Sequence, residues 1–353
     1  MFIYEIVGFY TITCLLSIYN CFEKNLLIKN IFVLLLLSLI LIAGMREPTI
    51  DSDFTNYVQV FETAPTLSSF DFDIYNSIEV GYLFLNAFLK WVFDDYRVIF
   101  ILMAFLHLSI YGYIFIRSSP FPILSLLVLV STNFLFEMAQ LRQGTVCSLM
   151  LLAGYYISQR QNNKFLLTIA VGCLFHYTML LGLVLYPLTL IHWSKKKVFL
   201  VAAICLLFLQ INWLNNFMEL LPNDWTLTIR LLNYADSINQ APEANRIVGD
   251  LKTIVLLIIF SMLRPVTKNQ EKYCNVLMTM FVFATVIRSG FHEYITFATR
   301  LSEPLFPSQY ILIPMLLYTR MNKYITIALI MVLCIIFFIK GLHEPFLFIF
   351  ESE

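Results

Sequence analysis

Four arginines stand beside apolar stretches in a chain that carries few other charges there: Arg46, Arg142, Arg288 and Arg300. A charge at membrane depth costs roughly several kcal/mol unless a partner or ligand compensates for it, so such a residue is a functional candidate. The planar guanidinium donates two parallel hydrogen bonds to phosphate oxygens and stays protonated at physiological pH. The four residues together predict a site for phosphate or pyrophosphate.

The structural alternative for each arginine is an ion pair with an acid nearby in the sequence. The available pairs are Arg142 with Glu137, Arg300 with Glu303, and Arg46 with Glu47 or Asp51. For any single arginine such a pair is as reasonable as a ligand. It is a weaker explanation for all four together.

Groups that could move a proton lie near these arginines in the sequence. His176 stands in the apolar segment Gly172-Cys-Leu-Phe-His176-Tyr-Thr178, and a histidine titrates near neutrality, so it could accept a proton or donate to phosphate. Its alternative role is hydrogen-bonded packing. Asp51, Asp53 and Glu79 are candidate general bases, although Asp51 and Asp53 could simply cap and solvate a helix.

The elements that position these residues must be membrane helices. Of the 353 residues 59% are hydrophobic and 13% are charged, and the mean hydropathy is +0.78. A soluble protein could not cover that much apolar surface. The runs are continuous rather than alternating, which predicts an all-α polytopic integral membrane protein and not a membrane barrel. The formal net charge of zero gives no reason to expect a nucleic-acid partner.

Several kinds of site have no support in the sequence. The seven cysteines show neither CxxC nor Cys/His ligand spacing, so we expect no disulfide framework and no metal site. HEXXH, Walker, GxSxG and DxD-type motifs do not occur. The missing DxD element disfavours a metal-dependent transferase that uses nucleotide sugars, and we expect no cofactor.

About twelve membrane helices follow from the apolar runs. The run 165–191 is too long for one span and holds His176 near its middle, so it predicts two short helices that meet at Phe175-His176. The run 80–93 is short and carries Lys90, which predicts a re-entrant or surface segment. The runs are 3–20, 30–45, 97–116, 120–136, 143–158, 165–191, 198–213, 250–263, 273–288, 303–318 and 324–340.

Basic linkers alternate with acidic ones along the chain. The positive-inside rule places the basic linkers in the cytoplasm, both termini outside, and the four arginines and His176 at the outer ends of helices. The basic linkers are 20–29, 117–119, 159–164, 194–197, 264–272 and 319–323. Residues 1–353 then form a single transmembrane domain with two long outer loops, 46–96 and 214–249.

The first outer loop has the pattern of an amphipathic helix. Pro48 disfavours helix just before it, Asp51 or Ser52 could cap it, and apolar residues recur at i, i+3, i+4 and i+7: Phe54, Tyr57, Val58 and Phe61. This predicts a helix lying in the membrane interface.

The order of these residues resembles the EpsG-type polysaccharide polymerases over about residues 1–340. The most specific likeness is Arg142-Gln143 between Phe136 and Ala153, together with Phe175-His176-Tyr-Thr. The other similar segments are Gly44-Met-Arg46 followed by Asp51, Asp53 and Tyr57; Glu79-Val-Gly81-Tyr82 with Asn86; and Arg300 with Pro304, Tyr310 and Pro314. The chain departs from the pattern at Thr145-Val-Cys147 and at Met179. These departures affect specificity more than chemistry, because they remove no candidate polar residue.

The resemblance implies a Wzy-like polymerase of O-antigen, capsule or exopolysaccharide in the bacterial inner (cytoplasmic) membrane. Such proteins join oligosaccharide repeat units carried on undecaprenyl pyrophosphate at the outer, periplasmic face, and a chain-length regulator protein is a possible partner. The implied roles are metal-independent. Arg142, with Arg288 or Arg300, would hold the donor pyrophosphate, and Arg46 the second one. Asp51, Glu79 or His176 would take the proton, while Asp53, Tyr57 and Gln143 would bind substrate.

Two other classes of function stay open from the sequence. A transporter or flippase of lipid-linked sugars would need charges at several depths along a cavity, whereas the charges here gather at one face. An O-antigen ligase or a polyprenyl-phosphate-dependent glycosyltransferase would use similar residues.

Overall fold

The computed structural model describes residues 2–48, 50–70, 78–211, 213–214, 243–263 and 268–343. Within these ranges the chain is helical and contains no β-strand. By length and composition five helical stretches could cross a membrane: α1 (Phe2–Phe22), α2 (Leu26–Gly44), α5 (Arg97–Ser118), Gln270–Gly290 within α15 (Lys268–Gly290), and α18 (Lys323–Leu342). The structure therefore shows a multi-pass membrane protein, and the count of twelve helices stays a prediction.

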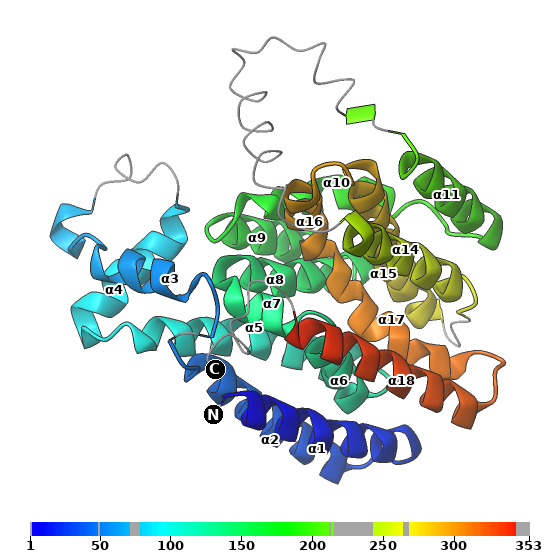
Figure 1. Cartoon of the computed structure of the whole chain (residues 1–353), viewed down its shortest axis with the longest axis horizontal. Helices are drawn as coiled ribbons and strands as arrows, with labels where there is room; N and C mark the ends of the chain where they lie inside the picture. Colours follow the sequence, from blue (N-terminus) through cyan, green and yellow to red (C-terminus); the bar gives the residue numbers. More distant parts are fainter. Residues whose placement is uncertain are drawn as a thin grey trace.

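The long helices run side by side across the molecule (Figure 1). α6 (Pro122–Thr132) packs against both α1 and α18, and α2 packs against α5. The Asn25 side chain begins α2 by accepting from the Ile28 N–H at 3.1 Å, and Asn322 begins α18 by accepting from the Tyr324 N–H at 2.9 Å. The outer faces of these helices expose leucine and isoleucine, which suits contact with lipid rather than water.

α8 (Leu141–Ser158) is the central helix and is covered by neighbours along its length. Before it comes α7 (Phe134–Ala139), and Gln140 breaks the helix between them at φ −103 and ψ 75. The two helices approach closely at Gly144, where an added Cβ would lie 2.6 Å from the Glu137 carbonyl oxygen. The break at Gln140 therefore depends on glycine at position 144.

The long apolar run 165–191 is split as the sequence predicts. α9 (Asn162–Cys173) ends before His176, and the chain then forms η2 (Tyr177–Leu180) and α10 (Leu181–Leu188). Arg160 before α9, Leu190 after α10 and Lys272 in α15 line one common cavity. η2 and α10 therefore return the chain to the end of the molecule from which α9 starts.

The described part of the first outer loop contains the α-helices α3 (Phe54–Glu62) and α4 (Val80–Phe93), at the left end of the molecule in Figure 1, and the short η1 (Leu67–Ser69). The predicted apolar stripe of α3 exists, but it is covered by protein. Phe54, Tyr57 and Phe61 are buried against α4 and α5, with Phe54 stacked on Phe100 at 4.5 Å between ring centroids. The expected cap is also different, because Asp53 precedes the helix and its side chain makes no capping bond.

The second half of the chain completes the bundle around α8. It comprises α11 (Lys195–Phe208), α14 (Glu243–Phe260), α15, α16 (Ile295–Ser302), η3 (Glu303–Ser308), α17 (Gln309–Met315) and η4 (Leu316–Tyr318). Most of the predicted outer loop 214–249 lies outside the described residues. α15 and η3 both pack on α8, which puts α16, the helix between them, next to the start of α8.

Candidate functional site

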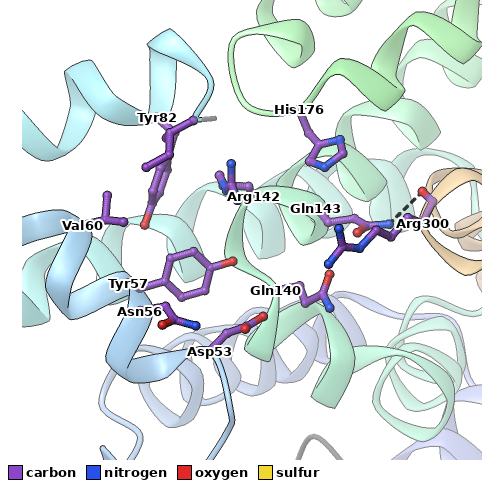
Figure 2. Close-up of a pocket in the computed structure, with 11 residues that line it drawn as sticks. Asp53, Asn56, Tyr57, Val60, Tyr82, Gln140, Arg142, Gln143, His176 and Arg300 are labelled. Carbon is purple, nitrogen blue, oxygen red and sulfur yellow. Dashed lines mark hydrogen bonds between the residues drawn. The ribbon is translucent and has the colours of Figure 1, made fainter. Parts of the chain in front are cut away.

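A cavity of about 180 Å³ opens between α3, α4, the start of α8, the break at His176 and α16 (Figure 2). Six of the ten candidate residues from the sequence line it: Asp53, Tyr57, Arg142, Gln143, His176 and Arg300. Asn56, Val60, Ile78, Tyr82 and Gln140 complete the lining. Side chains far apart in the chain thus meet at one place, as a shared substrate site requires.

Arg142 forms an ion pair with Glu79, which stands just before α4. The sequence suggested Glu137 as its structural partner, and this was wrong. α4 brings Glu79 there because its first turn is fastened to the loop before His176 by a hydrogen bond from the Tyr82 N–H to the Leu174 carbonyl, at 3.2 Å. Gly81 permits the approach, since a Cβ there would lie 2.6 Å from the Leu174 oxygen. Arg142 keeps 27% of its side chain exposed, so it can still reach a ligand.

His176 enters the cavity at the break between α9 and η2 (Figure 2). Its Nδ1 accepts from the Thr178 N–H at 3.3 Å and lies 2.9 Å from the Thr178 hydroxyl. Burial lowers the pKa of His176 below its usual 6.5; Arg142 and Arg300 act in the same direction, and Glu79 opposes them. The neutral ring therefore carries its proton on Nε2, because Nδ1 is occupied as an acceptor. That makes His176 a hydrogen-bond donor rather than a base.

Gln143 and Arg300 connect α8 with α16. The Gln143 side-chain amide donates to the Arg300 carbonyl at 3.0 Å, and the Arg300 side chain extends back into the cavity (Figure 2). Arg142 and Arg300 thus approach the same space from different helices. Two guanidinium groups with an imidazole N–H and an amide form a donor-rich lining suited to an anion with several oxygens.

α3 presents the opposite wall. Asp53, Asn56, Tyr57 and Val60 lie at i, i+3, i+4 and i+7 and share one helical face. Burial raises the pKa of Tyr57 to about 12, against the opposing effect of Arg142, so the phenol keeps its proton. Asp53 is only partly buried. Among the described residues, no other carboxylate lines this cavity.

Arg46 and Asp51 lie outside the cavity. The two form an ion pair of 2.9 Å with both side chains fully buried, as the local alternative in the sequence predicted. Arg46 also donates to the Ala43 carbonyl at 3.0 Å and stacks over the Phe100 ring at 4.5 Å. The structure therefore gives this pair a role in holding the start of the first outer loop, not in contacting substrate.

Arg288 is also absent from the cavity lining. It pairs with Asp250 at 2.7 Å and ties α15 to α14. Gly249 makes room for it, since an added Cβ would lie 2.9 Å from one guanidinium nitrogen. Of the four arginines, two line the cavity and two are structural ion pairs.

Some lining residues were missed in the sequence. Asn56 could have been found, because it continues the helical face defined by Asp53 and Tyr57. Gln140 carries no such signal, since its position depends on the break before α8. In the described residues, no three His, Cys, Asp or Glu side chains gather as a metal site would need.

Comparison with known proteins gives one result. Searches of the curated proteins and of the solved structures found no match. A family model described as the EpsG family matches residues 29–351, nearly the whole chain. The match includes every residue of the cavity described above. The chain therefore belongs to the EpsG family, a family of membrane proteins like the Wzy-type polysaccharide polymerases.

Proposed function

We propose that this protein joins oligosaccharide repeat units carried on undecaprenyl pyrophosphate into a long surface polysaccharide. Membership of the EpsG family supports a polymerase-like glycosyltransferase in general terms. The observation that carries the finer proposal is the meeting of Arg142, Arg300 and His176 in one cavity. The proposed site faces the outside of the bacterial cytoplasmic membrane, where the positive-inside rule puts these helix ends.

The donor in this proposal is a growing glycan whose anomeric carbon is bonded to pyrophosphate. Arg142 and Arg300 bind the pyrophosphate oxygens, and the His176 Nε2–H donates to one of them. Negative charge grows on the pyrophosphate as the bond to the anomeric carbon breaks, and fixed donors stabilise that charge most in the transition state. Exclusion of water at membrane depth strengthens the attraction.

The acceptor is one repeat unit on the same kind of lipid. One of its sugar hydroxyl oxygens bonds to the donor's anomeric carbon, undecaprenyl pyrophosphate leaves with the bonding electrons, and a base takes the hydroxyl proton. Asp53 is the base in this scheme, because it lines the cavity. Glu79 is engaged by Arg142, Asp51 is buried with Arg46, and His176 carries its proton on the ring nitrogen that remains for a ligand.

The decisive test is polymerisation by purified protein given undecaprenyl-pyrophosphate-linked repeat units alone. We expect a ladder of products without added metal, nucleotide or lipid A. Arg142→Ala should lower the rate by about 10²- to 10³-fold, the effect of losing one donor to a developing negative charge. Arg142→Lys should recover only part of it, because an ammonium lacks the planar fork.

Arg97→Ala is the matched control, since Arg97 is exposed, outside the cavity and only weakly paired with Asp95, at 4.0 Å. Its rate should equal that of the wild type. If the Arg142 variants polymerised normally, the pyrophosphate role would be untenable. Translocation of the lipid with no new glycosidic bond would identify a transporter instead, and a strict need for lipid A would identify a ligase.

A further inference from the structure

A second cavity, of about 290 Å³, lies at the other end of α8. Gln143 near the start of α8 lines the first cavity, whereas Ile157 and Ser158 at its end line the second. An α-helix of this length spans about 27 Å at ~1.5 Å per residue, close to the thickness of a bilayer's hydrocarbon core of ~30 Å. The two cavities therefore lie at opposite ends of α8, about one hydrocarbon core apart.

Hydrogen bonds within the protein hold the wall of the second cavity in place. The Asn275 side chain donates to the Thr189 and Ile191 carbonyls, both at 3.0 Å, and its oxygen accepts from the Trp193 N–H at 3.3 Å. The Trp193 ring N–H also donates to the Thr279 hydroxyl at 2.9 Å. These four bonds hold the turn after α10 against α15, so the cavity exists before any ligand binds.

Arg160 occupies a backbone position that ordinarily belongs to glycine. It has φ 57, and it follows α8 in a Schellman motif in which the Gln161 N–H donates to Tyr156 and the Arg160 N–H donates to Ile157, both at 3.0 Å. A side chain in the left-handed region costs about 1–2 kcal/mol. Arg160 adopts this conformation with its side chain lining the cavity, where a glycine would present no cation.

The charges in this cavity favour an anion. Arg160 and Lys272 line it and form no ion pair among the described residues, and His192 adds an imidazole. Glu271 is the one acid in the lining. Leu190 also lines the cavity and is 84% exposed, and an apolar side chain so exposed at a helix end suits contact with an acyl chain. Basic pockets between membrane helices bind phosphate-bearing headgroups in this way.

We propose that this second cavity binds the phosphate group of an anionic membrane lipid, through Arg160 and Lys272, at the membrane face opposite the candidate active site. The lipid holds the ends of α8, α10 and α15 together at that face. The site depends on the chain being a membrane protein and not on the proposed glycosyl transfer.

Binding of phosphatidylglycerol to the detergent-purified protein, measured by native mass spectrometry, tests the site. Arg160→Gly removes the guanidinium and suits the left-handed backbone, so Tm should not fall while phosphatidylglycerol binding weakens at least fivefold. Lys195→Ala removes the same charge outside the cavity, from the first turn of α11, and should change binding less than twofold. Glu271→Gln removes the opposing charge and should tighten binding about twofold or more, a gain that misfolding cannot produce.

Two results would overturn the proposal. Equal losses in Arg160→Gly and Lys195→Ala would mean a diffuse basic surface rather than a site. Displacement of phosphatidylglycerol by millimolar inorganic phosphate would mean that free anions are the ligand and that the acyl chains contribute nothing.

Discussion

At the scale of single residues, the hydrogen bonds of a side chain decide its chemistry more than its type does. Arg46 and Arg142 have the same functional group, but full burial with Asp51 removes the first from substrate, whereas the second remains partly exposed beside Glu79. His176 has the type of a general base, yet Thr178 occupies the ring nitrogen that would accept the proton. A sequence shows the groups, and only the fold shows which of their atoms are available.

The neutral state of His176 should appear in the pH dependence of stability. Its pKa is lower in the folded protein than its usual 6.5, so the unfolded chain binds more protons below that pH. The stabilisation is present above about pH 6.5 and is lost as pH falls towards the lowered pKa. Tm should therefore fall between pH 7.5 and 5.5, and it should fall less in His176→Asn, whose side-chain oxygen can still accept from Thr178.

The same variant lacks the ring N–H, so its kcat should fall about 10²-fold if that donor stabilises the departing pyrophosphate. An unchanged kcat in His176→Asn would contradict the donor role of the Nε2–H, and a pH slope equal to that of the wild type would contradict the lowered pKa of His176.

Glu79 and Asp53 should respond differently to loss of charge. Glu79→Gln keeps a hydrogen-bond acceptor for Arg142 but removes the competing anion, so KM for the donor should fall several-fold while kcat stays within about tenfold of the wild type. Asp53→Asn removes the proposed base and should lower kcat by about 10²- to 10⁴-fold. Steady-state kinetics on both variants distinguishes the roles, and a collapse of kcat in Glu79→Gln would transfer the role of base to Glu79.

At the scale of the elements, the break between α7 and α8 places Gln140, Arg142 and Gln143 in the cavity. Glu137 in α7 is fully buried and helps to fix this break. It accepts from the Tyr111 hydroxyl at 2.9 Å and from the Tyr310 hydroxyl at 2.8 Å. These tyrosines belong to α5 and α17, so one carboxyl group joins three helices beneath the site.

Glu137→Gln should cost much less stability than Glu137→Ala, because the amide oxygen still accepts from both hydroxyls. Glu137→Ala leaves two buried hydroxyls without their acceptor and creates a void, and it should cost about 3 kcal/mol or more. Thermal unfolding in detergent measures both changes. Equal stability of the alanine variant and the wild type would show that the carboxyl group is not what holds the three helices.

How far the sequence predicts these elements depends on the range of the interaction. The division at Phe175-His176 and the apolar stripe of α3 follow from local length and periodicity, and both are confirmed. Glu79, the partner of Arg142, is 63 residues away in the sequence, and a local pattern cannot predict a contact over that separation. The same limit applies to the environment of α3. Its apolar stripe does not show whether the helix packs against α5 or against lipid, and the structure shows that it packs against α5.

At the scale of the whole molecule, the two cavities define two ends of the bundle. The residues of the first come from the loop 46–96 and from helix ends that the charge pattern places outside. Those of the second come from two basic linkers that it places in the cytoplasm and from the chain segments next to the basic linkers. The fold thus groups at each end the segments that the positive-inside rule assigns to one side. That agreement concerns grouping, and orientation in the membrane needs its own measurement.

Single-cysteine labelling provides that measurement, because Ser52 and Lys195 are exposed at opposite ends and neither lines a cavity. The seven native cysteines are buried or partly buried, so their background labelling should be low, and a cysteine-free parent removes it. The maleimide is impermeant, and the outer layer of the cells is opened while the cytoplasmic membrane stays closed. Ser52→Cys should then be labelled, and Lys195→Cys should be labelled only after the cytoplasmic membrane is permeabilised. The reverse pattern would place the arginine-lined cavity in the cytoplasm and exclude polymerisation outside the membrane, whatever the residues in that cavity can do chemically.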